Sequence, residues 1–133
     1  MKQVIDKLWI GTYDDLINSD KDFIYLGNTK LSLDKLTKGR HIELKDDNSK
    51  QAIRILRAVN HIVKHIAYSN NDLLVCCDTG ISRSPYVIAS YYAYTLAIEI
   101  NEAYKLLKKH YPEADEQTPL RINDKWINRV VMV

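Results

Sequence analysis

The sequence VCCDTGISRSP, residues 75–85, decides the fold of this chain. It overlaps a short apolar run, DLLVC at residues 72–76, which is typical of a buried central strand. From Ser84 to about Ile98 the residue pattern predicts a helix. A polar loop between a strand and a helix directs successive backbone N–H groups into one concavity, and the positive end of the helix dipole faces the same point. The stretch therefore predicts a binding site for an oxyanion.

Residues of this loop have chemistry suited to a bound phosphoryl group. Cys77, at the first position, lies in the field of the loop amides, which favours its thiolate and makes it a nucleophile. Gly80 lets the backbone turn tightly, and Arg83 can fold back to hold two phosphate oxygens with its planar guanidinium, as lysine could not. The residues expected to bind the phosphate are Asp78, Thr79, Gly80, Ile81, Ser82 and Arg83.

Together these residues imply hydrolysis of a phosphate ester through a cysteinyl-phosphate intermediate. The sulfur would attack in line, while the loop N–H groups and Arg83 stabilise the charge on the equatorial oxygens. The leaving oxygen needs a proton donor, which should sit on a separate loop that reaches over the pocket. Asp46 and Asp47 follow a predicted strand at residues 40–44, and they are the candidate acids.

The rest of the chain alternates predicted strands and helices. Further strands are expected at residues 7–11 and 22–26, while residues 31–38 are ambiguous. Thr12 is expected to cap a short helix that ends near Asn18, and Ser49 to open a long one. A further helix is expected to be capped by Asn101 and to run to His110. A last amphipathic segment is expected after Pro119, with one face formed by Ile122, Trp126, Ile127 and Val130.

Composition favours a single α/β domain. The 133 residues are 46% hydrophobic and include only four glycines and three prolines, with no linker or repeat. We therefore expect one domain over residues 1–133, with a small, mostly parallel central sheet flanked by helices and a strand-loop-helix unit as its anion site. The formal charge of +2 is far from strongly basic, which argues against nucleic acid or a membrane as the main partner.

The cysteine and histidine positions argue against disulfides and metal sites. Cys76 and Cys77 are adjacent, with Cα atoms about 3.8 Å apart, which is below the spacing of an ordinary disulfide. Two adjacent cysteines, rather than several spaced ones, and the lack of an apolar N-terminal segment indicate a reducing, cytoplasmic compartment. No metal or cofactor is expected, because no ligand pattern is formed by His41, His61, His65 and His110.

At this point the residues resemble a known family. The pattern Cys77-x5-Arg83-Ser84 after a hydrophobic strand resembles the signature loop of the dual-specificity protein tyrosine phosphatases. The opening run LWIG at residues 8–11 and the position of Asp46 upstream of Cys77 are also similar to that family. The spacing of cysteine and arginine alone is shared with other phosphatase and rhodanese-like folds, but the likeness here covers most of the chain.

The resemblance implies a role for each matching residue. Cys77 would be the nucleophile, Arg83 the phosphate clamp, and Ser84 the hydroxyl that eases departure of the thiolate in the hydrolysis step. Asp46 would act first as general acid and then as general base, with Asp47 as the alternative acid. The chain departs from the family at Cys76, where the family normally has a histidine that helps to tune the nucleophile.

The same resemblance implies phosphorylated proteins as substrates. The chain lacks the segment that walls a deep phosphotyrosine pocket in larger relatives, so phosphotyrosine, phosphoserine and phosphothreonine are all expected. Phosphoinositides and RNA 5′ ends are second choices, because relatives acting on them tend to have basic residues where this loop has Asp78 and Thr79. Two further functions compete with a protein phosphatase: a pseudophosphatase that binds phosphoproteins without turnover, and a rhodanese-like sulfur transferase. No sequence pattern indicates the oligomeric state.

Overall fold

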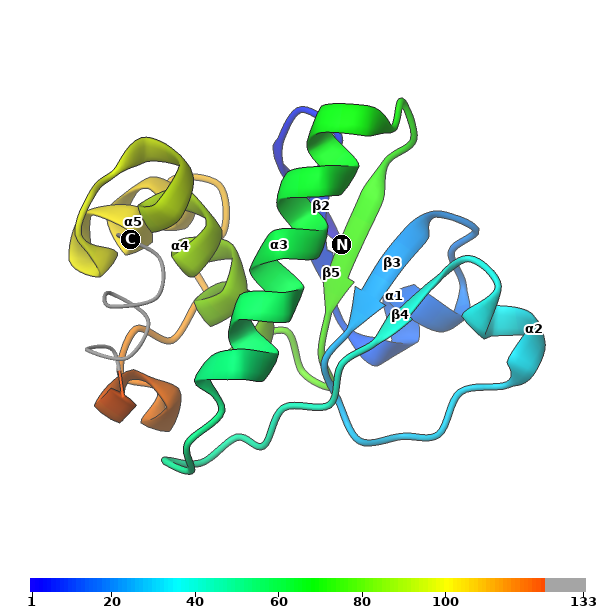
Figure 1. Cartoon of the computed structure of the whole chain (residues 1–133), viewed down its shortest axis with the longest axis horizontal. Coiled ribbons are helices and arrows are strands. Elements are labelled where there is room, and N and C mark those ends of the chain that lie inside the picture. The colour runs from blue at the N-terminus through cyan, green and yellow to red at the C-terminus, as the bar shows by residue number, and fades with distance from the viewer. Residues whose placement is uncertain (124–133) are drawn as a thin grey trace.

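The computed structural model describes residues 1–123, and its centre is a five-stranded sheet with the order β1-β2-β5-β3-β4 (Figure 1). Strands β2, β5, β3 and β4 run parallel, and β1 pairs with β2 in the antiparallel sense. The expectation of a small, mostly parallel sheet is therefore confirmed. The strands are β1 (Lys2–Ile5), β2 (Leu8–Gly11), β3 (Asp22–Tyr25), β4 (Gly39–His41) and β5 (Leu73–Cys76).

Strand β5 is the central strand, and all four of its residues are buried. Its last residue, Cys76, lies beside Gly11 of β2 and Tyr25 of β3 in the parallel register. The carboxyl ends of the three strands therefore meet at one edge of the sheet. Binding sites in parallel sheets form at this edge, because the loops that leave neighbouring strands come together there.

Helices cover both faces of the sheet, and each layer encloses a hydrophobic cluster. Helix α3 crosses the front of the sheet in Figure 1, with α4 and α5 beside it. Two short helices, α1 and α2, lie on the other side, over a smaller cluster that includes Phe23, Leu74 and Cys76. The helices are α1 (Tyr13–Ile17), α2 (Leu33–Leu36), α3 (Ala52–Tyr68), α4 (Arg83–Leu96) and α5 (Ile100–Lys108), followed by a 3-10 turn η1 (Pro119–Asn123).

The expected elements are present with some differences in their ends. Thr12 caps α1 as expected, in a capping box with Asp15. The two expectations for Ser49 and Asn101 as helix caps are wrong, since α3 and α5 begin after Gln51 and Glu99, whose side chains make no cap hydrogen bond. Strand β4 is shorter than expected and ends at His41. The ambiguous residues 31–38 contain α2, and the structure has one strand, β1, that is not among the predicted elements.

Two other expectations concern the chain ends and membranes. An amphipathic segment is expected after Pro119, and the structure shows its first part as η1. The expected residues Trp126, Ile127 and Val130 lie outside the described residues. Within residues 1–123, no helix combines the length and the apolar character needed to cross a membrane.

Candidate active site

The 77–84 loop leaves β5 at the edge where the strands meet and leads into α4. Gly80 has a φ angle of +73°, a conformation that residues with a side chain rarely adopt. The turn at Gly80 brings its N–H to 3.3 Å from Sγ of Cys77, toward which it donates a hydrogen bond. Backbone N–H groups of Tyr13 and Asp115 donate to the carbonyls of Asp78 (3.4 Å) and Ile81 (2.8 Å). The loop is therefore held from both sides while it curls around the cysteine sulfur.

The two neighbouring cysteines lie in different hydrophobic clusters. Cys77 is 1% exposed and packs in the cluster between the sheet and helices α3, α4 and α5. Cys76 is fully buried on the side of α1 and α2, where its thiol donates to the carbonyl of Ile24 at 3.6 Å. Burial raises the pKa of the Cys76 thiol well above its ordinary value. Cys76 is therefore a structural thiol, and Cys77 is the candidate nucleophile.

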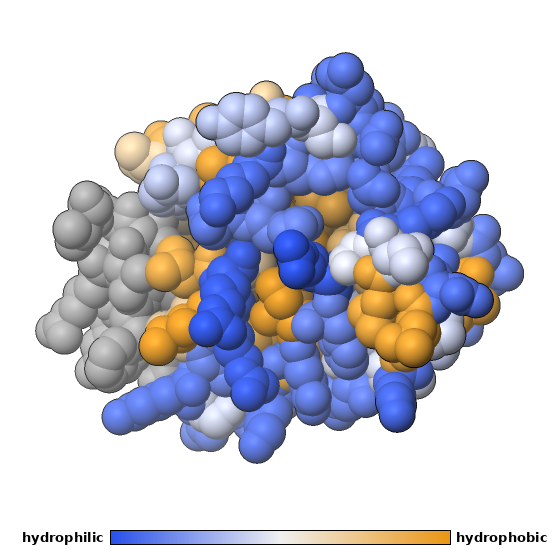
Figure 2. Space-filling model, turned by 45° about the vertical axis from the view of Figure 1, so that its right-hand side comes forward, coloured by the Kyte–Doolittle hydropathy of each residue, from blue (hydrophilic) through white to orange (hydrophobic). Residues whose placement is uncertain are grey.

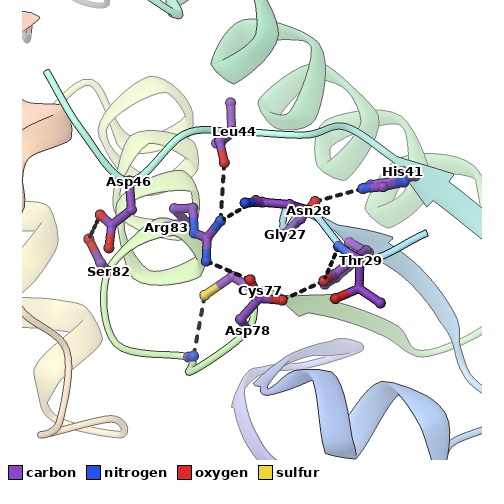
Figure 3. Close-up of polar contacts among 12 residues, drawn as sticks. Gly27, Asn28, Thr29, His41, Leu44, Asp46, Cys77, Asp78, Ser82 and Arg83 are labelled. Atoms are coloured by element: carbon purple, nitrogen blue, oxygen red, sulfur yellow. Dashed lines mark hydrogen bonds and ion pairs between the residues drawn. The ribbon is translucent and has the colours of Figure 1, made fainter. Parts of the chain in front are cut away.

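Arg83 is held by three acceptors from three segments of the chain (Figure 3). Its Nη1 donates to Oδ1 of Asn28 at 2.9 Å and to the carbonyl of Leu44 at 3.1 Å. Its Nη2 donates to Oδ2 of Asp78 at 3.0 Å, which makes an ion pair within the loop. A guanidinium fixed at this many points is already oriented before an anion binds, so the binding loses little conformational entropy.

The carboxylate of Asp78 is shared between Arg83 and Tyr25, whose hydroxyl donates to Oδ1. The N–H of Thr29 donates in turn to the Tyr25 oxygen at 3.1 Å. Partial burial raises the pKa of Asp78, but the hydrogen bonds from Tyr25 and Arg83 outweigh it and hold the pKa below its ordinary value. The charge of Asp78 is therefore paired within the loop.

The segment that follows β3 completes the support of Arg83. A Cβ atom at Gly27 would collide with the Tyr25 hydroxyl and the Asp78 carboxylate, so this position requires glycine. The Nε2 atom of His41 lies 2.6 Å from the carbonyl of Gly27 and must carry the hydrogen, since a carbonyl oxygen only accepts. Strand β4 thereby holds the turn that presents Asn28 to Arg83.

The Asp78–Arg83 pair predicts a pH-dependent part of the stability. Because folding lowers the pKa of Asp78, the charged carboxylate stabilises the fold above its unfolded-state pKa of about 3.9, and this contribution disappears as the pH falls through the folded value. We expect wild type to have a higher Tm than Asp78→Asn near neutral pH, with a gap that closes in acid. Thermal unfolding between about pH 7 and about pH 2 measures this gap. A gap independent of pH would contradict a stabilising charge at Asp78.

The two candidate acids differ in what they contact. Oδ1 of Asp46 accepts a hydrogen bond of 2.7 Å from the hydroxyl of Ser82, which connects it to the 77–84 loop. The Ser82 hydroxyl also lies 2.5 Å from that of Thr118. Oδ1 of Asp47 accepts from the N–H of Ser49 at 2.8 Å. Hydrogen bonding from the side chain of Ser49, together with that from its backbone, lowers the pKa of Asp47. The structure thus brings Asp46 to the loop and leaves Asp47 in its own turn.

The remaining expected residues lie on the loop as follows. Ser84 is fully buried, and its hydroxyl has no hydrogen-bond partner among residues 1–123. A buried polar group without a partner is uncommon, and in a functional loop it is consistent with a role in the reaction. The side chains of Thr79 and Ile81 are exposed, so they form the outer rim of the loop.

Sequence reasoning missed Tyr25, Asn28, Leu44 and Thr118. A signal existed for Asn28, because polar residues that follow a buried strand are expected at the carboxyl edge of a parallel sheet. No comparable signal in the sequence pointed to the other three residues. Leu44 acts through its backbone carbonyl, Thr118 lies far along the chain, and Tyr25 lies within a strand. In the described part of the chain, no group of three or more His, Cys, Asp and Glu side chains is placed to hold a metal ion.

Comparisons with known proteins gave a family match and several similar structures. The model of the family described as dual specificity phosphatase, catalytic domain, matches residues 8–121. No curated protein sequence matches the chain. Two similar solved structures are Tk-PTP in the active form, with 18% identity, a TM-score of 0.79 and 96% of each chain covered, and human DUSP28, with 14% identity, a TM-score of 0.78 and 98% and 97% covered.

A third similar structure is the human tyrosine phosphatase-like serine/threonine/tyrosine-interacting protein, with 14% identity and a TM-score of 0.81 over 100% of this chain and 98% of that one. At such identities the structural likeness concerns the fold alone. The family match is broader, because residues 8–121 include β2, the Asp46 segment, the 77–84 loop and Thr118. The chain therefore belongs to the family of dual specificity phosphatase catalytic domains.

Proposed function

We propose that the protein hydrolyses phosphotyrosine and phosphoserine or phosphothreonine esters in proteins through a cysteinyl-phosphate intermediate. The observation that carries this proposal is the convergence of three groups on one loop. The Gly80 N–H donates to Cys77 Sγ, the guanidinium of Arg83 is fixed beside Asp78, and Ser82 connects Asp46 to the same loop. A nucleophile, a cation and an acid so arranged suit transfer of a phosphoryl group.

In the first step, the thiolate of Cys77 attacks phosphorus and forms the S–P bond while the P–O bond to the substrate breaks. The loop amides and Arg83 stabilise the negative charge of the equatorial oxygens. Asp46, in its protonated form, transfers its proton to the leaving oxygen, so the dephosphorylated side chain departs as a neutral hydroxyl. The enzyme then holds a phosphocysteine and a carboxylate.

In the second step, water attacks the phosphocysteine and Asp46 takes its proton, as microscopic reversibility requires. The S–P bond breaks, inorganic phosphate forms, and Cys77 leaves as a thiolate. The buried hydroxyl of Ser84 has no partner among residues 1–123, so it is free to donate a hydrogen bond to this developing charge. This step restores the starting state.

Separate substitution of the two neighbouring aspartates by asparagine tests which of them is the general acid. We expect Asp46→Asn to lower kcat by about 10²-fold on a phosphopeptide, whose leaving group needs a proton, and less on an aryl phosphate with a stable phenolate leaving group. Asp47→Asn, the matched control, should stay close to wild type, since Asp47 bonds within its own turn. Steady-state kinetics on both substrates measure the difference. A larger loss for Asp47→Asn would show that Asp47 is the acid.

A phosphoprotein-binding module without turnover is the second candidate function. The observation in its favour is the likeness to the human protein whose name describes it as phosphatase-like and interacting. Measured hydrolysis decides between the two, because a wild-type protein that binds phosphopeptides but turns over neither them nor an aryl phosphate would be such a module. Phosphoinositides and RNA 5′ ends belong in the same assay as competing substrates.

The chemistry also requires reducing conditions, so the proposal includes a cytoplasmic location. Cys77 must be a free thiol to attack phosphorus, and both cysteines are free and buried.

A further inference from the structure

A groove with a basic lining lies at the start of α3, next to the segment that carries Asp46. It has a volume of about 530 Å³. Among the described residues that line it, four are cationic and none is acidic. The residues that matter here are Lys45, Lys50, Gln51, Ile53, Arg54 and Arg57.

The groove is held together by hydrogen bonds between its two walls. The side chain of Gln51, a residue only 8% exposed, accepts from the N–H of Lys45 at 2.6 Å and donates to its carbonyl at 2.8 Å. Nη1 of Arg54 donates to the carbonyl of Glu43 at 3.0 Å. These bonds tie the backbone of the segment before Asp46 to the first turns of α3, so the two walls of the groove keep a fixed distance from each other.

The lining of the groove carries an excess of positive charge. Helix α3 carries Arg54, Arg57 and Lys64 and no acidic residue, although the whole chain has a formal charge of only +2. Figure 2 shows hydrophilic side chains running down this part of the surface. On α5, by contrast, Lys105 and Lys108 are paired with glutamates. Asp46 and Asp47, which follow Lys45 in sequence, do not line the groove, and the positive charge of Lys45 contributes to the lowered pKa of Asp47.

The position of the groove favours a polypeptide as its occupant. Lys45 directly precedes Asp46, which Ser82 ties to the 77–84 loop, so the groove begins one residue from the candidate acid. A chain whose phosphorylated side chain reaches Cys77 would extend past this segment. A compact headgroup with several phosphates would instead need free cations within the loop itself. There, Arg83 is the single cationic residue, and no loop residue lines the groove.

We propose that this groove binds acidic side chains of the substrate polypeptide near the phosphorylated residue, and that it thereby sets a preference for acidic sequences. The inference rests on the proposed function as a protein phosphatase. Charge pairing at a partly exposed surface favours the correct partner mainly through encounter and discrimination between partners, and it weakens as the salt concentration rises.

The test compares two phosphotyrosine peptides that differ only in flanking residues, glutamates in one and glutamines in the other. We expect wild type to favour the glutamate peptide about tenfold in kcat/KM, and the double variant Arg54→Glu, Arg57→Glu to lose this preference. The control Lys105→Glu, Lys109→Glu changes the net charge equally and should keep it. Retained preference in the Arg54→Glu, Arg57→Glu variant would overturn the proposal.

Binding measurements separate a failure of the groove from a failure of catalysis. Fluorescence anisotropy should show that wild type and the Lys105→Glu, Lys109→Glu control bind the glutamate peptide more tightly than the glutamine peptide, whether or not turnover occurs. The Arg54→Glu, Arg57→Glu variant should bind both peptides equally. Equal binding of both peptides to wild type would overturn the groove assignment, even if hydrolysis of an aryl phosphate supports the enzyme. The last measurement compares binding of wild type and of the Arg54→Glu, Arg57→Glu variant to phosphatidylcholine vesicles with and without phosphatidylserine. Loss of vesicle binding in the variant, with peptide preference unchanged, would assign the face to membranes and overturn the proposal.

Discussion

Cys77→Ser should lower kcat for aryl phosphate and phosphopeptide hydrolysis by roughly 10⁴-fold or more. A serine hydroxyl stays protonated at neutral pH, and in the described structure the Cys77 sulfur contacts a donor, the N–H of Gly80, and no base. The oxygen would therefore be a poor nucleophile in a loop that remains able to bind the phosphoryl group. Steady-state kinetics and phosphopeptide binding to the same variant measure the two effects separately.

The matched control is Cys76→Ser, the same atomic change one residue earlier. Cys76 faces the α1 and α2 cluster and bonds to the carbonyl of Ile24, which a hydroxyl can also do. We expect kcat to stay close to wild type and the free energy of unfolding to fall by roughly 1–3 kcal/mol, because a more polar group enters an apolar cluster. A folded Cys76→Ser variant as inactive as Cys77→Ser would refute the assignment of the nucleophile.

Arg83→Lys should reduce kcat/KM by about 10³-fold, although the formal charge is unchanged. The guanidinium donates to Asn28, Leu44 and Asp78 at once, and an ammonium group on a flexible chain cannot reproduce this fork. The variant would leave the Asp78 carboxylate and the Leu44 carbonyl short of a donor. The phosphoryl group would then lose both charge stabilisation and orientation.

Two measurements distinguish lost chemistry from lost folding in this variant. We expect Tm to fall, since a partly buried ion pair and two hydrogen bonds are weakened, but circular dichroism should show a folded protein at the assay temperature. Inhibition by orthovanadate, which mimics the transferring phosphoryl group, should weaken strongly. Arg40→Lys, at an exposed position of β4, is the control and should behave as wild type. A kcat/KM for Arg83→Lys within tenfold of wild type would contradict the role of Arg83 as phosphate clamp.

The sequence allowed the strand-loop-helix unit to be predicted because its signals are local. The apolar run that became β5, the glycine of the 77–84 loop and the following helix all lie within a short stretch. The support of Arg83 depends instead on strand order. Only because β3 lies next to β5 do Tyr25 and Asn28 reach the loop, and no sequence pattern specifies which strands pair.

The helix caps show the same limit on a smaller scale. Serine and asparagine favour helix starts when only local bonds compete, which is why Ser49 and Asn101 are reasonable predictions. In the folded chain, Gln51 bonds to Lys45, and the side chain of Asn101 accepts from Arg121. Such partners outside the helix outweigh local preference, and helix-capping propensities do not specify them.

The opposite orientation of the two cysteines decides how the enzyme would respond to peroxide. A nucleophilic thiolate is oxidised to a sulfenic acid, which a neighbouring thiol can trap as a disulfide before further oxidation. Cys76 is buried on the other side of the sheet, and the chain has only two cysteines. Trapping of an oxidised Cys77 as a disulfide would therefore depend on a small thiol from solution, such as glutathione. A sulfenic acid that is not trapped would be converted irreversibly to a sulfinic acid on continued exposure.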